Sequence, residues 1–146
     1  MNVVILAGGF GTRISEFTDV IPKPMVPIGG KPIVWHIMNN FSYFNMDNFY
    51  LALGYKSEKL KDYFSNYHRL NSDFSVDLSN GNINFINNPK NNWNVNLIDT
   101  GLNTMTGGRV KRIFEHMEKE RFILTYGDAL SNVNINELLK SIKKQA

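Results

Sequence analysis

A glycine-rich segment follows the first apolar run of the chain and could do chemistry. Residues 8–13 read Gly-Gly-Phe-Gly-Thr-Arg. Glycines let a backbone approach a phosphate closely and point successive N–H groups at it, and arginine adds a planar fork that suits phosphate oxygens. The segment lacks the Gly-Lys-Ser/Thr of a P-loop, and Ile14 stands where a dinucleotide fingerprint has its third glycine. By itself it predicts either a phosphate-binding loop or a tight turn.

Two charged residues stand in contexts that would fix their side chains in space. Lys23 is flanked by Pro22 and Pro24, and prolines restrict the backbone on both sides and favour extended neighbours. A lysine held in this way can act as a fixed cation for a charged transition state, although an exposed turn lysine has the same pattern. Asp128 follows an apolar run and Gly127, which suits either a Mg²⁺ ligand or a helix N-cap.

A second glycine pair, Gly107-Gly108, precedes Arg109 at the start of an amphipathic segment. Backbone N–H groups at a helix start can bind an anion, and Arg109 could reach back over the preceding loop. The alternative is a flexible helix start with an exposed arginine. The three histidines do not cluster in the sequence, and no spacing predicts a Ser-His-Asp triad.

The elements that must position these residues alternate between strands and helices. Short apolar runs predict strands, and apolar residues three and four apart predict helices. Ser57 could cap one helix, and Asn134 with Glu137 could form a capping box for another. Alternating apolar residues on both sides of Asn80-Gly81 predict a β-hairpin. The predicted strands cover residues 2–7, 49–53, 95–98 and 122–126, and the first and last of them are predicted to be buried. The predicted helices begin near residues 32, 57, 107 and 134.

This alternation predicts one α/β domain over residues 1–146, with a Rossmann-like, largely parallel (mixed) sheet flanked by helices. Ligands of such sheets bind beyond the carboxyl ends of the strands. Three polar, glycine-containing segments, residues 8–13, 100–109 and 127–128, follow predicted strands. We therefore expect them to meet at one rim of the sheet.

Composition excludes several classes of protein. The chain is 42% hydrophobic with a net charge of +3, which is typical of a folded domain rather than a disordered one. No run of 18 apolar residues exists, so no membrane span is expected. The 16 basic residues barely exceed the 13 acidic ones, and no aromatic RNA-binding pattern is present, so we expect no nucleic-acid partner. The absence of cysteine excludes disulfides and fits a cytoplasmic location.

Taken together, the segments resemble the signature of the sugar-1-phosphate nucleotidylyltransferase family. The first match is Leu6-Ala7-Gly8-Gly9-Phe10-Gly11-Thr12-Arg13, and the second is Pro22-Lys23-Pro24-Met25. Residues 28–38, 93–95, 99–101, 105–109 and 125–128 are similar to the cytidylyl branch, the glucose-1-phosphate cytidylyltransferases. The resemblance covers nearly the whole chain.

The resemblance implies the nucleotidyltransferase fold and the reaction of CTP with α-D-glucose 1-phosphate to CDP-glucose and pyrophosphate. It also implies Mg²⁺ as cofactor, a homo-oligomer, and a place in the synthesis of sugars for bacterial surface polysaccharide. By resemblance Arg13 and Lys23 are catalytic, and Asp128 holds the metal. The implied substrate-binding residues are Leu6, Ala7, Gly8, Gly9, Phe10, Gly11, Thr12, Arg13, Lys23, Thr104, Arg109 and Asp128.

The chain departs from the family mainly in length, because family members are considerably longer. Their second half supplies most of the sugar site and a second metal-binding aspartate, so the resemblance implies a nucleotide-binding domain without that half. Two alternatives stay open: a non-catalytic nucleotide-binding module, and an enzyme of the same fold that uses dTTP or UTP. We expect an exposed sheet edge or apolar patch where the second half would dock.

Overall fold

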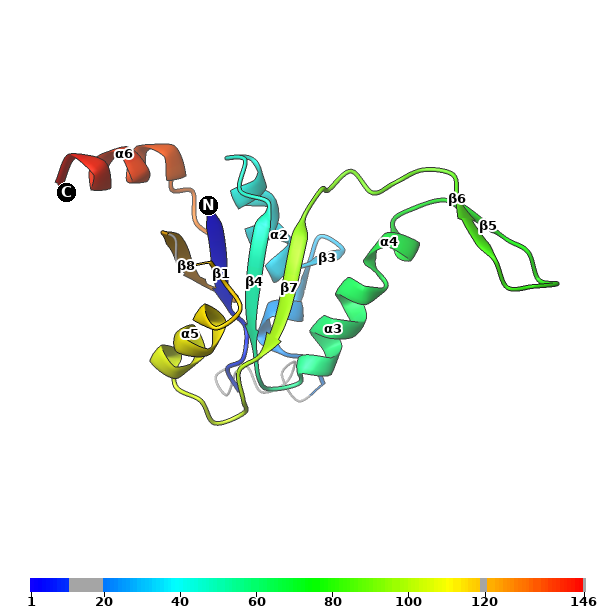
Figure 1. The fold of residues 1–146 in the computed structure, drawn as a ribbon, viewed down its shortest axis with the longest axis horizontal. Coiled ribbons are helices and arrows are strands. Elements are labelled where there is room, and N and C mark those ends of the chain that lie inside the picture. Colours follow the sequence, from blue (N-terminus) through cyan, green and yellow to red (C-terminus); the bar gives the residue numbers. More distant parts are fainter. Residues whose placement is uncertain (11–19, 119–120, 146) are drawn as a thin grey trace.

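The computed structural model describes residues 1–10, 20–118 and 121–145, with side chains in the last helix described up to residue 142. Its centre is a sheet of four parallel strands in the order β7-β4-β1-β8 (Figure 1). The parallel arrangement confirms the predicted α/β class. The strands are β1 (Asn2–Leu6), β4 (Asn48–Leu53), β7 (Asn94–Asp99) and β8 (Phe122–Tyr126).

Helices cover both faces of the sheet. The odd-numbered β1 side chains Val3 and Ile5 pack with the buried side chains of α2 (Ile33–Ser42) and with Leu60 of α3 (Ser57–Ser65). The even-numbered Val4 packs in a second cluster with Ile113 of α5 (Thr106–Phe114). Because successive strand side chains point to opposite faces, one apolar strand serves both clusters.

Three asparagines align at the amino ends of neighbouring strands. In the parallel register, Asn2 of β1 lies beside Asn48 of β4, which lies beside Asn94 of β7. The Asn48 amide donates to Asn2 Oδ1 at 2.6 Å, and the Asn94 amide donates to Asn48 Oδ1 at 2.8 Å. These three asparagines therefore form a polar ladder across the strands that stabilises their register.

The helix caps follow the sequence only in part. In α6 (Ile135–Gln145) the Glu137 N–H donates to Asn134 Oδ1 at 3.2 Å, so Asn134 caps as predicted. The prediction for Ser57 is wrong: Lys56, with φ at 50°, is the capping position of α3, and no side chain bonds there. The left-handed residue already turns the chain into the helix, so Ser57 becomes its first residue. The chain then breaks after Ser65 into the short α4 (Tyr67–Leu70).

Two hairpins complete the fold. The strands β2 (Pro27–Ile28) and β3 (Lys31–Pro32) pair antiparallel and are joined by Gly29 and Gly30, both of which have positive φ. The strands β5 (Phe74–Val76) and β6 (Ile83–Phe85) pair antiparallel around Gly81, as the Asn-Gly signal predicts. Figure 1 shows that this second hairpin projects away from the sheet, beyond α4.

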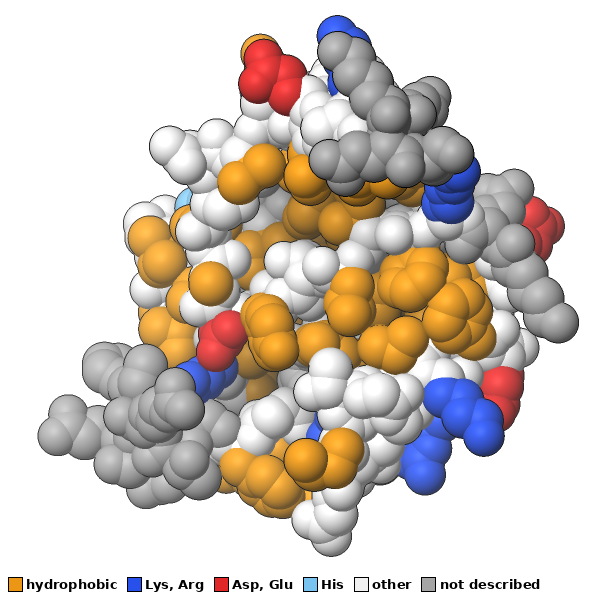
Figure 2. Space-filling model, turned by 90° about the vertical axis from the view of Figure 1, so that its left-hand side faces the viewer, with side chains coloured by type: hydrophobic (Ala, Val, Ile, Leu, Met, Phe, Trp, Pro, Cys, Tyr) orange, Lys and Arg blue, Asp and Glu red, His pale blue; other side chains and the backbone are white. Residues whose placement is uncertain are grey.

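The last strand differs from its prediction as a buried strand. Leu124 and Tyr126 of β8 are 44% and 62% exposed. Among the described strands, β8 pairs only with β1, so one edge of it has no neighbouring strand. Figure 2 shows hydrophobic side chains gathered in a band over this side of the molecule, where β8 and α6 lie. No helix in the described ranges is long and apolar enough to cross a membrane.

Candidate functional site

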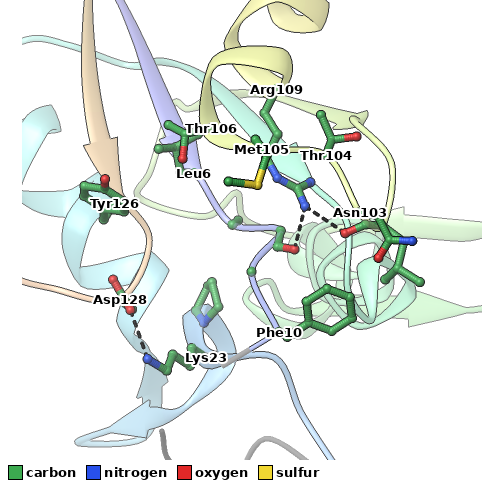
Figure 3. Close-up of a pocket in the computed structure, with 15 residues that line it drawn as sticks. Leu6, Phe10, Lys23, Asn103, Thr104, Met105, Thr106, Arg109, Tyr126 and Asp128 are labelled. Carbon is green, nitrogen blue, oxygen red and sulfur yellow. Dashed lines mark hydrogen bonds and ion pairs between the residues drawn. The ribbon is translucent and has the colours of Figure 1, made fainter. Parts of the chain in front are cut away.

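A cavity of about 440 Å³ lies at the carboxyl ends of the parallel strands, where ligands of such sheets bind. Its volume falls within the usual range of ligand pockets, about 300–1,000 Å³. Nine of the predicted site residues line it, and the other three, Gly11, Thr12 and Arg13, lie outside the described residues. The nine are Leu6, Ala7, Gly8, Gly9, Phe10, Lys23, Thr104, Arg109 and Asp128 (Figure 3).

Position 8 requires a glycine because the Arg109 side chain approaches the main chain closely there. A Cβ at Gly8 would lie 2.2 Å from Arg109 Nη1 and 2.9 Å from the Gly54 nitrogen. A Cβ at Gly54 would clash in the same way, at 2.5 Å from the same nitrogen. Gly9, by contrast, has nothing within 4 Å of its Cβ position. The first glycine therefore makes room for a buried arginine, whereas the second leaves open space where β1 meets the cavity.

Arg109 joins the ends of three strands. Its Nη1 donates to Leu53 O at 2.9 Å and to Thr100 Oγ1 at 2.8 Å, and its Nη2 donates to Gly8 O at 3.0 Å and to Leu102 O at 3.1 Å. The side chain is buried, and this burial lowers the pKa of its guanidinium. A guanidinium offers five donors in a rigid fork, and here four bonds hold main chain and a threonine in place. Arg109 thus fixes the wall of the cavity from inside.

A second arginine, Arg112, holds the loop that follows β7. Its Nη1 donates to Thr104 Oγ1 at 2.9 Å and also to Thr100 O. Gly101, with φ at 86°, allows this contact because a Cβ there would lie 2.5 Å from Arg112 Nη1. Sequence reasoning did not single out Arg112. Its position one helical turn after Arg109 is the signal that could have found it.

Lys23 and Asp128 face each other across the mouth of the cavity (Figure 3). Lys23 Nζ lies 3.3 Å from Asp128 Oδ2, and the side chains are 21% and 40% exposed. Pro22, the neighbour before Lys23, is extended as predicted. Residues Lys23–Met25 form a 3-10 turn, so the predicted extended conformation is wrong for Pro24, the neighbour after Lys23. The Met25 N–H closes this turn on Pro22 O at 2.8 Å, and buried Pro24 anchors it.

Asp128 is the residue of the cavity that could hold a metal ion. No cluster of three or more metal-ligating side chains occurs in the part of the chain that the structure describes, and Asp128 is the sole carboxylate among the residues lining the cavity. Mg²⁺ needs only one or two carboxylates when phosphates and waters complete its shell. The half-exposed Asp128 fits one ligand of such a site.

Comparisons with known proteins find similar sequences along almost the whole chain. The sequence model of the nucleotidyl transferase family matches residues 2–146. The chain is 44% identical over 139 residues to a probable glucose-1-phosphate cytidylyltransferase of Bacillus subtilis, covering 95% of this chain and 54% of the relative. It is 46% identical over 136 residues to the glucose-1-phosphate cytidylyltransferase of Salmonella typhimurium, covering 92% and 53%.

A solved structure has a similar fold over almost the whole chain. The crystal structure of HddC from Yersinia pseudotuberculosis complexed with GMP-PN aligns with a TM-score of 0.68 and 30% identity, over 96% of this chain and 53% of that one. The chain spans about half the length of the curated relatives it matches.

Proposed function

The chain belongs to the nucleotidyl transferase family, and from that premise we propose that it forms the nucleotide-binding part of a glucose-1-phosphate cytidylyltransferase. Such an enzyme transfers a cytidylyl group from CTP to α-D-glucose 1-phosphate and releases pyrophosphate. One observation carries the proposal: the Gly8-Gly9 main chain, a cation and a carboxylate converge on one cavity at the carboxyl ends of parallel strands. The identity of about 45% to two such enzymes supports the choice of substrates.

The proposed reaction is an in-line displacement at the α-phosphorus of CTP. A phosphate oxygen of glucose 1-phosphate forms the new P–O bond, and the bond to the pyrophosphate leaving group breaks. A phosphate monoester is already ionised at neutral pH, so no general base is required. The main barrier is repulsion between two anions, which fixed cations and N–H donors reduce. Holding two substrates side by side supplies much of the remaining rate gain.

Each site residue then has a proposed task. The main chain of residues 6–13 takes the nucleotide, with Arg13 on the triphosphate and Lys23 beside the reacting phosphates. Asp128 would hold Mg²⁺, which neutralises phosphate charge when bound. Thr104 lies on the loop that Arg109 and Arg112 brace, so we assign base selection to this loop and a bracing role to Arg109 besides its contact with the nucleotide.

The Lys23–Asp128 ion pair is part of this proposal. The two side chains are partly exposed and 3.3 Å apart, and exposed pairs contribute only about 0–1 kcal/mol. The pair therefore separates at little cost when a triphosphate and a cation compete for its members. Lys23 is then free to donate to phosphate oxygens.

The wider setting rests on the resemblance alone. We propose Mg²⁺ as cofactor, CTP and glucose 1-phosphate as substrates, a homo-oligomeric assembly, and a cytoplasmic role in making sugars for bacterial surface polysaccharide. A second candidate function is a nucleotide-binding module without turnover. The presence of a single carboxylate among the described residues that line the cavity favours that alternative.

The test measures CTP affinity by calorimetry, with and without Mg²⁺, for Lys23→Met and Asp128→Asn. Each should weaken Mg²⁺-dependent CTP binding by roughly 10- to 100-fold, the value of a lost hydrogen bond to a charged group. The matched controls are Lys111→Met and Glu115→Gln, exposed residues that do not line the cavity. Equal affinities in the site variants and the controls would refute the site.

Product analysis separates the alternatives. CDP-glucose formed from CTP, glucose 1-phosphate and Mg²⁺ supports the enzyme, whereas CTP binding without product supports the binding module. Tighter binding of dTTP or UTP than of CTP would reassign the nucleotide.

A further inference from the structure

The segment that follows β7, residues 101–105, forms one side of the cavity, and we call it the β7 loop. Leu102, Asn103, Thr104 and Met105 all line the cavity. Leu102 and Met105 are 51% and 83% exposed, so their side chains add little packing against the core. The shape of the β7 loop therefore depends mainly on its hydrogen bonds.

The Thr104 side chain lies between two glycines. A Cβ at Gly101 would lie 2.8 Å from Thr104 Oγ1, and a Cβ at Gly108 would lie 2.8 Å from Thr104 Cγ2. Both distances are shorter than the contacts that real Cβ atoms make. Glycine at these two positions thus lets the threonine lie close against the main chain, with its methyl group toward α5 and its hydroxyl toward the start of the loop.

The partner of this hydroxyl is Arg112 of α5. Arg112 Nη1 donates to Thr104 Oγ1 at 2.9 Å and also to Thr100 O. Arg112 is exposed and is not among the residues that line the cavity. It therefore holds the β7 loop from the solvent side, away from the space that a ligand would fill.

Other bonds hold the start of the β7 loop. The Gly101 N–H donates to Asp99 Oδ1 at 2.9 Å, and the buried Arg109 donates to Leu102 O at 3.1 Å. Neither bond involves Thr104, whose hydroxyl is bonded to the exposed arginine alone among the described residues. The position of the middle of the loop therefore depends on that arginine.

The β7 loop and the ion pair lie on different sides of the cavity. Figure 3 shows Asn103 and Thr104 on one side, and Lys23 with Asp128 on the other. The function proposed above places the triphosphate beside Lys23 and the metal at Asp128. Because the base lies at the opposite end of a nucleotide from its triphosphate, the β7 loop faces the base end.

We propose that Arg112 is a positioning residue, which shapes the β7 loop to receive the base end of the nucleotide. It acts through the Thr104 hydroxyl and the Thr100 carbonyl, and it does not touch the ligand. The hydroxyl of Thr104 then serves the shape of the loop rather than a direct contact with the base. This inference rests on the proposed function, because that function places the triphosphate at the ion pair.

The first experiment compares CTP with inorganic triphosphate, which has the phosphates but no base. Calorimetry measures binding of each in the presence of Mg²⁺ to the wild type and to Arg112→Met. The variant should bind CTP about tenfold more weakly, near the lower limit for a lost hydrogen bond to a charged group. It should bind inorganic triphosphate within about twofold of the wild type, because salt screens an exposed charge.

The matched control is Lys111→Met, which removes a charge from the neighbouring exposed position and leaves the bonds of the β7 loop intact. It should change neither affinity by more than about twofold, as expected for an exposed side chain. If Arg112→Met weakens both ligands equally, its effect is one of charge or of stability, and the positioning role is wrong. An unchanged CTP affinity in Arg112→Met overturns the proposal as well.

A double-mutant cycle tests whether Arg112 acts through Thr104. Thr104→Val removes the hydroxyl and keeps the shape of the side chain, so it should weaken CTP binding by no more than Arg112→Met does. Added to Arg112→Met, it should weaken binding by less than about threefold further, because the two side chains share one hydrogen bond. Effects that multiply in the double variant would show that the hydroxyl contacts the nucleotide itself, and would overturn the proposal.

The conservative variant is Thr104→Ser, which keeps the hydroxyl that accepts from Arg112. It should bind CTP within about threefold of the wild type, since the bond to the loop is retained. A loss as large as that of Thr104→Val would assign the effect to the methyl group beside Gly108 and would contradict the role of the hydroxyl.

Failure of the positioning role is distinguishable from failure of the proposed function. Lys23→Met and Asp128→Asn should weaken CTP binding whatever Arg112 does. If these two variants weaken it and Arg112→Met does not, the positioning role alone is wrong. If none of the three weakens CTP binding, the proposed function is wrong as well.

Discussion

The strands β1 and β8 are neighbours in one sheet, yet their surroundings differ sharply. Both are short apolar runs followed by glycine, and both end at the same cavity. Val3, Val4 and Ile5 of β1 are fully buried, whereas Leu124 of β8 is nearly half exposed. An apolar run therefore indicates a strand, but its burial depends on what covers it.

Because of this difference, the wall of the cavity at the end of β1 is held by hydrogen bonds from a buried side chain, and we call it the firm wall. The wall at the end of β8 is more exposed to solvent. The firm wall is the end of β1, where Arg109 ties Gly8 to the ends of β4 and β7. The other wall is the end of β8, where Gly127 bonds to Leu6 O and Asp128 meets the partly exposed Lys23. Gly8 and Arg109, which we propose to contact the nucleotide, thus lie on a braced wall, while the proposed metal ligand Asp128 follows a strand that has one open edge among the described residues.

The largest expected effect comes from truncating a side chain in each strand. Ile5→Ala removes fully buried atoms and should lower the free energy of unfolding by about 3–4 kcal/mol. Leu124→Ala in β8 should cost about 1 kcal/mol or less, because its side chain is already half in water. Urea denaturation measures both. Similar losses would mean that a partner covers β8 in solution.

The sequence predicted the strands, the parallel class and the meeting of the glycine segments, because apolar periodicity and glycine positions are local signals. It did not predict that β8 is exposed, since the position of a strand in the sheet depends on long-range pairing. The hydrogen bonds of Arg109 were equally out of reach. Its acceptors are main-chain carbonyls and a threonine hydroxyl from segments up to 101 residues away. Every residue type has a main-chain carbonyl, so the sequence does not indicate which carbonyls accept a hydrogen bond from Arg109.

The next effect tests the firm wall itself. Arg109→Met removes the hydrogen bonds that the guanidinium donates to Gly8 O, Leu53 O and Leu102 O. Gly8 O and Leu53 O keep the main-chain N–H groups of Tyr55 and Thr100 as donors, so the cost is that of losing hydrogen bonds to a charged group, about 1.5–3 kcal/mol for one such bond. We expect a total loss of about 2–3 kcal/mol in the free energy of unfolding, together with weaker CTP binding. Arg109→Lys should rescue little, since an ammonium lacks the planar fork.

The control for this arginine is Lys111→Met on the same helix, where the side chain is exposed. It should change stability by no more than about 0.5 kcal/mol. If Arg109→Met unfolds at the same urea concentration as this control, the bracing role of the guanidinium is wrong.

The smallest effect on stability is expected at the exposed face of β8. Tyr126→Thr keeps a strand-forming residue and removes an aromatic ring that is 62% exposed, so unfolding should shift by about 0.5 kcal/mol or less. The same change should reduce binding of a hydrophobic dye such as ANS and slow aggregation, because it removes exposed apolar surface from β8. Tyr43→Thr, at another highly exposed tyrosine outside the sheet, is the control for loss of an aromatic ring. If both variants bind the dye as the wild type does, the band over β8 is already covered in solution, and the two strands are more alike than the isolated chain suggests.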